Sequence, residues 1–491
     1  MEKNKSFTEE ANWNPDPSLY NKDLAPVSNE KGGWKRWTYI AIWMGAIHSI
    51  SQWTITAAMI QSGMSFWQAF SAALVADLFI FAALIGNSFA GTKYGVPFPV
   101  LIRAVFGHRA ALIPIFIRGI IGIFWFGVFM YLGSEAITIG LSAIIPGWGN
   151  LANIHILGME LTTAIGYIIS IIIHYIFVTH GVERIRQFEH WAGPLIMVIA
   201  VGLVIWAVDI AGGFAPLVNI ESTVPEGEFW GLFFLSVTGI VGTFSTLMVN
   251  NPDLTRFAQN QKEQVVGQLI GFPLMFMVYS TMSLLVAAGT VVAYGEAISD
   301  PARIIAQFDN PFIVFFGSLI LLASIVSVNA ATNAIAVGFD LAAIAPKKLT
   351  FNRAGIIGIS VGIFTAPWLW FGEAEIMNDL FGILGSAMGP ILGLMLADYY
   401  LIRKRKYDVK SLFVTDGIYS YGNGWNMLAI ISFSVGLLVA LSGLIIPSLN
   451  WLYSYNWFLG VIFGGITYII LMSIKKDQIV EKTSNSYSDA K

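Results

Sequence analysis

The chain has 491 residues, of which 56% are hydrophobic and 12% are charged, and its formal net charge at pH 7 is −3. Length alone would allow two or three soluble domains, but this composition excludes them and is typical of a polytopic membrane protein. The chain contains no cysteine, which excludes disulfides, thiolate metal sites and thiol nucleophiles.

Both ends of the chain are polar. Residues 1–33 have the composition of a tail rather than of a cleavable signal peptide, and residues 475–491 are similar to them. We therefore expect a cytoplasmic N-terminal tail and a cytoplasmic C-terminal tail on either side of a membrane domain.

Between the tails, apolar runs of about twenty residues predict an all-α fold with about twelve transmembrane helices. Basic residues gather in every second loop, most densely at Arg403–Lys406 after the tenth span, whereas among the alternate loops only the one with Arg303 carries a cation. The positive-inside rule then predicts an even number of spans, cytoplasmic termini and a multi-pass protein of the cell (inner) membrane.

The first span, residues 40–56, has an unusually polar middle. Along a helix Gly45 lies roughly 14 Å in from Arg36, near the midplane of a hydrocarbon core about 30 Å thick, and His48 and Ser49 follow it. A helix that breaks here would expose carbonyl groups and a helix dipole to a solute. An unbroken helix would use the small residues only for close packing, and this stretch alone leaves both interpretations open.

The sixth span repeats this pattern, with Gly239 and Thr243 at mid-depth, and predicts a second broken helix. We divide the membrane domain into a first set of five helices at 34–212, a second set at 228–408, and two further helices at 424–474. Five crossings are an odd number, so the second set would be inverted relative to the first. Broken helices that open both sets indicate a transporter site at the midplane.

Polar residues of the eighth span and a tryptophan of the third span are further candidates for the midplane site. In the eighth span Ser324 and Ser327 are three residues apart, and Asn329 and Asn333 are four apart, so each pair can share a helix face. Buried polar groups at mid-depth are costly unless they are paired, which makes them functional candidates. Trp125, in the middle of the third span, would ordinarily be core packing, but beside two broken helices its indole face is a candidate shelf for a flat heterocycle.

Ionisable residues inside apolar runs are candidates for proton coupling. Asp77 and Glu135 lie in the second and third spans, where carboxylates are functional candidates by default. Asp77 has no polar neighbour in sequence, so it either pairs with a hydroxyl of another helix or carries a proton. His48 titrates in the useful range, or it donates to carbonyl groups that the helix break frees.

Several long motifs in the right order make the chain similar to the nucleobase:cation symporter family 1, in particular its bacterial allantoin, hydantoin and uracil permeases. The motifs are A-I-W-M-G-A-I-H in the first span, A-G-T-K-Y-G-V-P-F-P-V-L-I-R-A at Ala90, R-Q-F-E-H-W-A-G-P at Arg186, N-P-D-L-T-R-F at Asn251, S-V-N-A-A-T-N at Ser327 and M-G-P-I-L-G-L-M-L-A-D-Y-Y-L-I-R-K-R at Met388. The resemblance covers all the spans. It implies a LeuT-type 5+5 inverted repeat plus two C-terminal helices, alternating access, and cation-coupled import of a small heterocycle.

The resemblance also implies roles for single residues. Trp125 matches the tryptophan on which the substrate ring stacks, and Asn333 matches the asparagine that hydrogen-bonds the ring amides. Ser49 stands where members place an amide side chain of the first span. Thr243 stands where a glycine of the sixth span offers its backbone.

Two positions depart from the family pattern. Phe244 replaces a second stacking tryptophan, and Phe129 replaces a glutamine that reads the ureide edge of hydantoin or allantoin. Phenylalanine cannot make those hydrogen bonds, and an unpaired polar edge would cost about 1 to 3 kcal/mol. The alternative function is therefore a symporter for a vitamin precursor or an amino acid on the same fold.

For the coupling ion the resemblance implies a sodium site, where members have one. Its ligands would be the carbonyl groups of Gly45, His48 and Ser324 and the hydroxyl of Ser327, but Val328 lacks the second hydroxyl of the pair. Loss of an oxygen ligand weakens a sodium site. We therefore expect H+ rather than Na+ as the coupling ion, and no other cofactor.

Other classes of function have little support. The chain contains neither H-E-x-x-H nor G-x-S-x-G, which disfavours an intramembrane enzyme. A channel would need repeated pore-lining groups rather than one midplane cluster. The expected partners are a small heterocyclic substrate and the lipid bilayer, with no nucleic acid and no obligate protein partner.

Overall fold

The computed structural model describes residues 14–27, 33–48, 50–179, 181–298, 300–371 and 374–488, and the side chains within these ranges except those of 50, 51, 374–381 and 475–488. Within these ranges, ten helices are long and apolar enough to cross a membrane. Two of the predicted spans are absent from this set. The first span is split into two helices of 12 residues each, and the ninth has only 14 helical residues, Phe351–Phe364. The prediction of an all-α polytopic membrane protein is confirmed.

The helices of the first part of the chain are α1 (Arg36–Ile47), α2 (Ile50–Gln61), α3 (Phe66–Tyr94), α4 (Phe98–Phe106), α5 (Leu112–Ile144), α6 (Leu161–Thr179), α7 (Gly181–Ile210) and α8 (Ala215–Val218). A short hairpin precedes α6, in which β1 (His155–Ile156) pairs antiparallel with β2 (Met159–Glu160). Local sequence sets these bounds. For example, α3 starts at a capping box between Ser65 and Gln68 and ends at Gly95, whose φ of 68° suits glycine.

The second part contains α9 (Phe229–Asn250), α10 (Pro252–Thr255), α11 (Gln261–Leu269), α12 (Met275–Tyr294), α13 (Pro301–Ile305), α14 (Pro311–Asn329), α15 (Ile335–Ile344), α16 (Phe351–Phe364), α17 (Ala374–Ala397), α18 (Met427–Ile445), α19 (Asn450–Tyr453) and α20 (Asn456–Ser488). Turns of π-helix join α11 to α12 at Ile270–Leu274 and α14 to α15 at Ala330–Ala334. A third π-helical turn, Asp398–Ile402, follows α17. The proposed division at 34–212, 228–408 and 424–474 stays a prediction.

The predicted break in the first span is confirmed. Helix α1 ends at Ile47, and His48 has a non-helical backbone with φ −80° and ψ 60°. The second predicted break is wrong, because α9 is a single helix of 22 residues. Its polar residues do not interrupt it, since the Thr243 hydroxyl donates back to the carbonyl of Ile240 at 2.7 Å, and small residues leave the helical hydrogen bonds intact.

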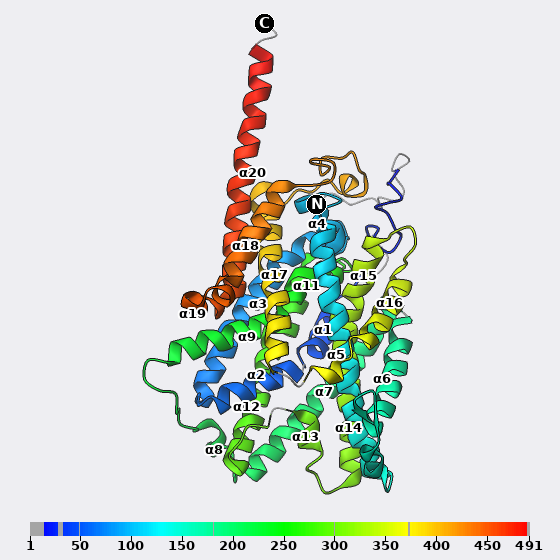
Figure 1. The fold of residues 1–491 in the computed structure, drawn as a ribbon, viewed down its shortest axis with the longest axis vertical. Helices are drawn as coiled ribbons and strands as arrows, with labels where there is room; N and C mark the ends of the chain where they lie inside the picture. The colour runs from blue at the N-terminus through cyan, green and yellow to red at the C-terminus, as the bar shows by residue number, and fades with distance from the viewer. Residues whose placement is uncertain are drawn as a thin grey trace.

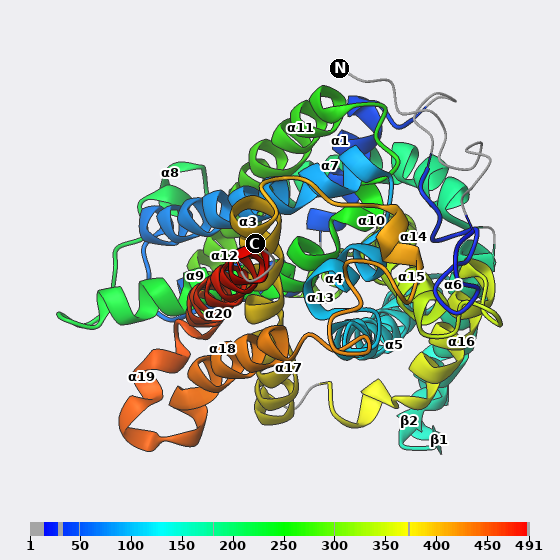
Figure 2. The same cartoon turned by 90° about the horizontal axis from the view of Figure 1, so that it is seen from above.

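Helix α20 runs out of the bundle at one end, where α4 and the loop between α17 and α18 also lie (Figure 1). We call this the basic end, because it carries the Arg403–Lys406 run. Seen from above, α17, α18 and α20 lie together along one side of the bundle, apart from α6 and α16 (Figure 2).

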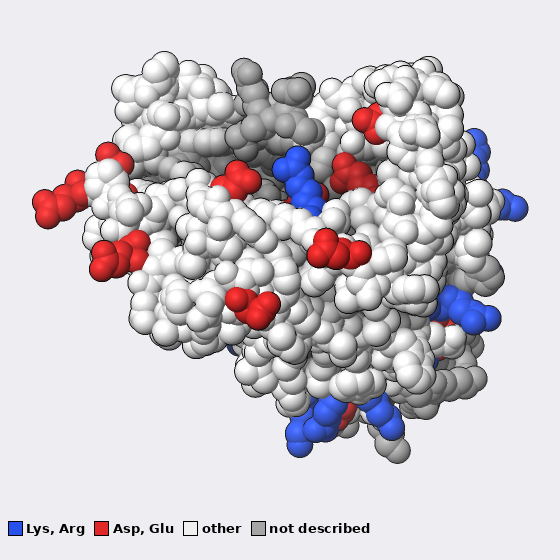
Figure 3. Space-filling view, turned by 90° about the horizontal axis from the view of Figure 1, so that it is seen from below, with Lys and Arg blue, Asp and Glu red and all other residues white. Residues whose placement is uncertain are grey.

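The opposite end holds α8 and α13 (Figure 1). Figure 3 looks onto this end and shows acidic side chains spread over the middle of the face, with few basic ones among them. Its loops contain Glu221, Glu226 and Asp309, together with the cation Arg303. We call this the acidic end, and the asymmetry of charge between the two ends follows the predicted alternation of the loops.

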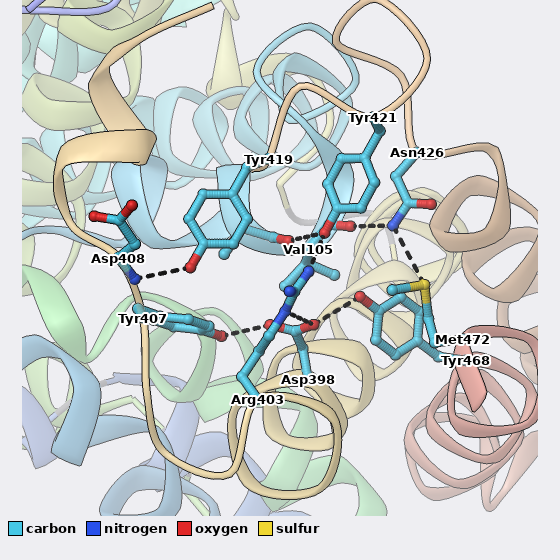
Figure 4. A network of polar contacts seen from close by, with 11 residues as sticks. Val105, Asp398, Arg403, Tyr407, Asp408, Tyr419, Tyr421, Asn426, Tyr468 and Met472 are labelled. Carbon is cyan, nitrogen blue, oxygen red and sulfur yellow. Dashed lines mark hydrogen bonds and ion pairs between the residues drawn. The ribbon is translucent and has the colours of Figure 1, made fainter. Parts of the chain in front are cut away.

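At the basic end, a polar network fastens the last helices to the bundle (Figure 4). The carboxylate of Asp398 accepts hydrogen bonds from the hydroxyls of Tyr407 and Tyr468, each at 2.8 Å. Arg403 lies 3.5 Å from the same carboxylate and donates to the Tyr421 hydroxyl at 2.7 Å. The network thus joins the end of α17, the following loop and α20.

Glycines let α17 and α20 approach each other more closely than side chains would allow. A Cβ atom added at Gly389 would lie 2.5 Å from the carbonyl oxygen of Trp457, and one added at Gly393 would overlap the carbonyl oxygen of Val461. Small residues at helix contacts are the usual source of tight packing in membranes. The contact between these two helices therefore depends on the absence of side chains.

We expect Gly393→Ala to destabilise the protein by about 1 to 3 kcal/mol, because the new methyl group forces α17 and α20 apart. The measurement is the thermal unfolding temperature of purified protein in detergent. Gly385→Ala is the matched control in the same helix, since a Cβ there has no atom within 4 Å, and it should not lower the unfolding temperature. Equal unfolding temperatures for both variants would contradict the close contact.

Candidate functional site

The break between α1 and α2 lies against α12 and α14. The Nδ1 atom of His48 is 2.6 Å from Oγ of Ser324 on α14. The imidazole ring lies 4.6 Å from the ring of Tyr279 on α12 and 6.5 Å from that of Trp53 on α2, measured between centroids. His48 and Ser324 are both buried, so the unwound backbone is enclosed by protein rather than by lipid, as non-helical backbone at this depth requires.

One turn further along α14, a carboxylate completes the cluster. The hydroxyl of Ser327 donates a hydrogen bond of 2.6 Å to Oε2 of Glu189 on α7, and Glu189 is fully buried. Its other oxygen, Oε1, has no hydrogen-bond partner among the described residues. A Cβ atom added at Gly45 would overlap Glu189 Oε2 and lie 2.6 Å from Ser327 Oγ. Gly45, Glu189 and Ser327 thus bring α1, α7 and α14 to one point.

The carboxylate of Glu189 stands against Gly45 and Ser327, two of the positions at which the family resemblance implies sodium ligands, and the Ser324 hydroxyl is engaged with His48. A carboxylate oxygen is itself a ligand that a hard cation prefers. The identity of the coupling ion therefore stays a prediction.

Sequence reasoning missed Glu189, although the residue lies within the motif that begins at Arg186. The spacing of the small and apolar residues that follow Glu189 could have identified it. Ala192, Gly193 and Ile196 are three, four and seven residues after Glu189, and all four are buried, which is the pattern of one helix face turned to the core. A Cβ atom at Gly193 would lie only 2.8 Å from the carbonyl oxygen of Ala41, so the face that carries the carboxylate packs directly on α1.

The residues predicted to bind a substrate ring gather around the π-helical turn between α14 and α15. Asn333 lies in this turn, and its amide donates to Oδ1 of Asn329 at 3.1 Å. Asn329 in turn donates to the carbonyl oxygen of Phe126 on α5 at 3.3 Å. Trp125 and Phe129 stand one turn apart on α5 with ring centroids 6.0 Å apart. The hydrogen bonds of Asn329 therefore link the turn that carries Asn333 to the helix that carries Trp125.

The same turn is held from the basic end by a buried cation. Arg118 on α5 donates to the carbonyl oxygen of Thr332 at 2.9 Å, and Arg118, Asp340 and Asp253 are all fully buried. Asp253 accepts a hydrogen bond of 2.8 Å from the backbone N–H of Phe98 at the start of α4. Arg118 thus holds the turn from α5, and Asp340 and Asp253 are the buried carboxyl groups whose charges act on it.

Toward the acidic end the break borders a pocket. It lies between α7, α13 and α14 and is small, with a cavity volume of about 10 Å³. Apolar side chains such as Leu203 and Ile305 line most of it, and His48 and Ser324 form its polar part.

Other predicted site residues lie elsewhere. Phe244 on α9 is 2% exposed and packs edge-on against Phe272 and Phe276, with centroids 5.3 and 5.6 Å away. Thr243 is partly exposed beside Gly242, where an added Cβ would meet no atom within 4 Å. The structure therefore places Phe244 in the contact between α9 and α12, and Thr243 on an open face of α9. Ser49 lies outside the described residues.

The two predicted membrane carboxylates are not part of the cluster around Glu189. Asp77 is buried on α3, which packs on α9, α12 and α17, and its Oδ1 has no hydrogen-bond partner among the described residues. Glu135 is half-buried on α5, where Tyr131 and the residues Asp300 and Arg303 of the acidic end are its polar neighbours.

Comparison with known proteins identifies relatives of the whole chain. The sequence model of a family described as permease for cytosine/purines, uracil, thiamine and allantoin matches residues 26–460. The allantoin permease of Bacillus subtilis is 40% identical over 93% of this chain and 94% of its own length, and the putative allantoin permease of Escherichia coli is 30% identical over 94% and 96%.

A solved structure has the same fold. It is that of MHP1, a nucleobase-cation-symport-1 family transporter, in a closed conformation with bromovinylhydantoin bound. The TM-score is 0.77 at 22% identity, and the alignment covers 93% of this chain and 95% of that one. With the family match over most of its length, the chain belongs to the nucleobase:cation symporter family 1, a family of multi-pass membrane permeases.

Proposed function

We propose that the protein imports a small ureide or nucleobase-like heterocycle by cation-coupled alternating access, and that allantoin is its first candidate substrate. The observation that carries this proposal is the position of Trp125 on α5 and of Asn333 in the π-helical turn, because Asn329 and Asn333 join this turn to α5 by hydrogen bonds and the turn also contacts α1. An indole face and an amide are complementary to a flat ring with polar edges. The names of the two permeases that are 40% and 30% identical favour allantoin within this class.

In this proposal the substrate ring stacks on Trp125, and Asn333 pairs with its amide groups. Ser49 supplies a further polar contact from the first span, as the family resemblance implies. Thr243 makes no such contact in this conformation, because its hydroxyl donates within the unbroken helix α9. Phe129 covers the ring edge with an apolar surface. Phe244 borders the site from α9, although its ring is packed on α12 in this conformation.

The orientation of the protein in the membrane follows from charge. The basic end carries Arg403–Lys406 and the polar C-terminal tail, so by the positive-inside rule it faces the cytoplasm of the cell. Both termini are then on the cytoplasmic side of the cell (inner) membrane.

Protons are the proposed coupling ion, because Val328 lacks the second hydroxyl that the family's sodium site would use. A second candidate substrate is a vitamin precursor or an amino acid. The apolar, buried side chain of Phe129 favours it, because such a substrate has fewer amide groups to satisfy than allantoin.

A ligand screen tests the substrate class. A ligand that binds only the folded state stabilises it by about 2.7 kcal/mol at a concentration of 100 Kd, so allantoin should raise the unfolding temperature of the purified protein. Hydantoin, uracil, thiamine and an amino-acid mixture serve as comparison ligands. Stabilisation by thiamine or an amino acid but not by allantoin would favour the second candidate.

We expect Trp125→Ala to abolish saturable allantoin binding while the protein remains folded, because one stacking face is lost and no charge is exposed. Equilibrium binding to purified protein measures this. Trp191→Ala is the matched control, since Trp191 is 81% exposed on α7, and it should bind as wild type. Wild-type affinity in the Trp125 variant would rule out the indole as the shelf.

Phe129→Gln should strengthen allantoin binding by about 1 kcal/mol, roughly fivefold, because the amide can pair with the ureide edge. Phe129→Leu, which stays apolar, separates this gain from a mere change of shape and should not strengthen binding. If the glutamine variant binds allantoin more weakly than wild type, the side chain at this position does not face the substrate edge.

A further inference from the structure

A segment that precedes the first helix lies across the basic end, beside α15 and α16 (Figures 1 and 2). We call residues 16–27 the strap. Its first residue, Asp16, donates its backbone N–H to the carbonyl oxygen of Phe413 in the loop between α17 and α18, at 2.8 Å. Its last residue, Val27, donates to the carbonyl oxygen of Gly95 between α3 and α4, at 2.9 Å. The strap therefore spans the distance between two separate connections of the bundle.

Two buried arginines hold the strap by its main-chain carbonyl groups. Arg256, which follows α10 and is 1% exposed, donates to the carbonyl oxygen of Asp23 at 2.7 Å and to that of Ala25. Arg103 on α4 is 2% exposed and donates to the carbonyl oxygen of Leu19 at 2.9 Å. Burying a cation is costly when its hydrogen-bond acceptors are removed. The strap can therefore leave these arginines only where water takes its place.

Asp23 connects the residues after α10 to α16. Its carbonyl oxygen accepts from Arg256, and its Oδ2 accepts a hydrogen bond of 2.8 Å from the N–H of Phe351, the first residue of α16. Asn21 fixes this geometry, because its Oδ1 accepts from the N–H of Asp23 at 2.8 Å and its amide donates to the carbonyl oxygen of Leu349 at 2.6 Å. One short turn of the strap thus bridges α10 and the loop between α15 and α16.

Little apolar surface holds the strap in place. Within residues 16–27, all of which the structure describes, the buried hydrophobic side chains are Leu19, Leu24 and Ala25. A segment with few buried apolar contacts opens at a lower free energy than the core of a protein. The strap can therefore detach while the helices stay folded.

Alternating access requires the basic end to open when substrate leaves for the cytoplasm, and the strap joins connections of both predicted five-helix sets at this end. We infer that the strap is a latch, which keeps the ends of these helices together and must detach from α16 or from Arg256 before substrate is released. This assignment rests on the proposed function. Because Arg256 needs water when the strap leaves, detachment is linked to hydration of the basic end.

The first assay fixes the strap in place in the full chain. The chain has no cysteine, so Asn21→Cys/Leu349→Cys carries the only two thiols, and a short bifunctional thiosulfonate reagent can join them. In proteoliposomes the cross-linked protein should lose allantoin counterflow, and dithiothreitol should restore it. The two single variants, treated with the same reagent, are the controls and should retain counterflow. Full counterflow in the cross-linked protein would overturn the inference, because the strap would not need to move.

The second assay needs no substrate. Ala25→Cys places one thiol beneath the strap, where Ala25 is 8% exposed, and its rate of reaction with a maleimide in purified protein reports detachment. Addition of Asn21→Ala should raise this rate about tenfold, because it removes hydrogen bonds that hold the strap. Lys22→Ala, at the exposed neighbouring position, is the matched control and should not change the rate. Equal rates in the Asn21 and Lys22 variants would contradict a strap that detaches.

The two assays separate this inference from the proposed function. If Asn21→Ala speeds the labelling but wild type exchanges no allantoin, the proposed substrate fails and the latch stands. If the double cysteine variant does not fold, labelling decides alone. Asp23→Ala, which removes the acceptor of the Phe351 N–H, is then the second variant. It should also speed the labelling, and an unchanged rate in both variants would overturn the assignment.

Discussion

The interruption of the first transmembrane span is the constraint on which the rest of the centre depends. At this depth, backbone that leaves the helix must be buried in protein or line a cavity. Here it is enclosed by α7, α12 and α14, and His48 contacts both Ser324 and Tyr279. Because the break needs these neighbours, it fixes which helices meet at the middle of the bundle.

Glycine makes that meeting possible on both sides of α1. On one side, Gly45 and Gly193 bring α1 and α7 together around a carboxylate. On the other, a Cβ at Gly267 or Gly271 would lie 2.7 Å from backbone atoms of Arg36 or Ile40. Helix α1 is therefore held by backbone contact, whereas the face of α9 that carries Gly242 meets open space. The two spans that look alike in sequence have different surroundings and different structures.

The polar groups of the centre lie in successive layers along α14 and α15. Ser324 contacts His48 at the helix break, and Ser327 contacts Glu189. Asn329 and Asn333 follow at the π-helical turn. Asp340, which is buried, lies further along α15. A π-helical turn displaces the residues that follow it relative to a regular helix and is frequent at functional sites. One continuous helical run thus connects the residues at the helix break, the proposed substrate site and the buried carboxyl group of Asp340.

The sequence by itself determined the class of protein, its family and most of its helices, because spans of about twenty apolar residues and alternating basic loops are imposed by the bilayer on each segment separately. It also offered a break as one of two interpretations of the first span, and the structure shows this break at His48. Tertiary structure alone decided that α9 is unbroken, that Phe244 packs on α12, and that Glu189 rather than Asp77 or Glu135 meets Ser327. The hydropathy of one helix does not show which of its faces packs against another helix. The free-energy cost of burying a charged side chain depends on the groups that this packing places around it.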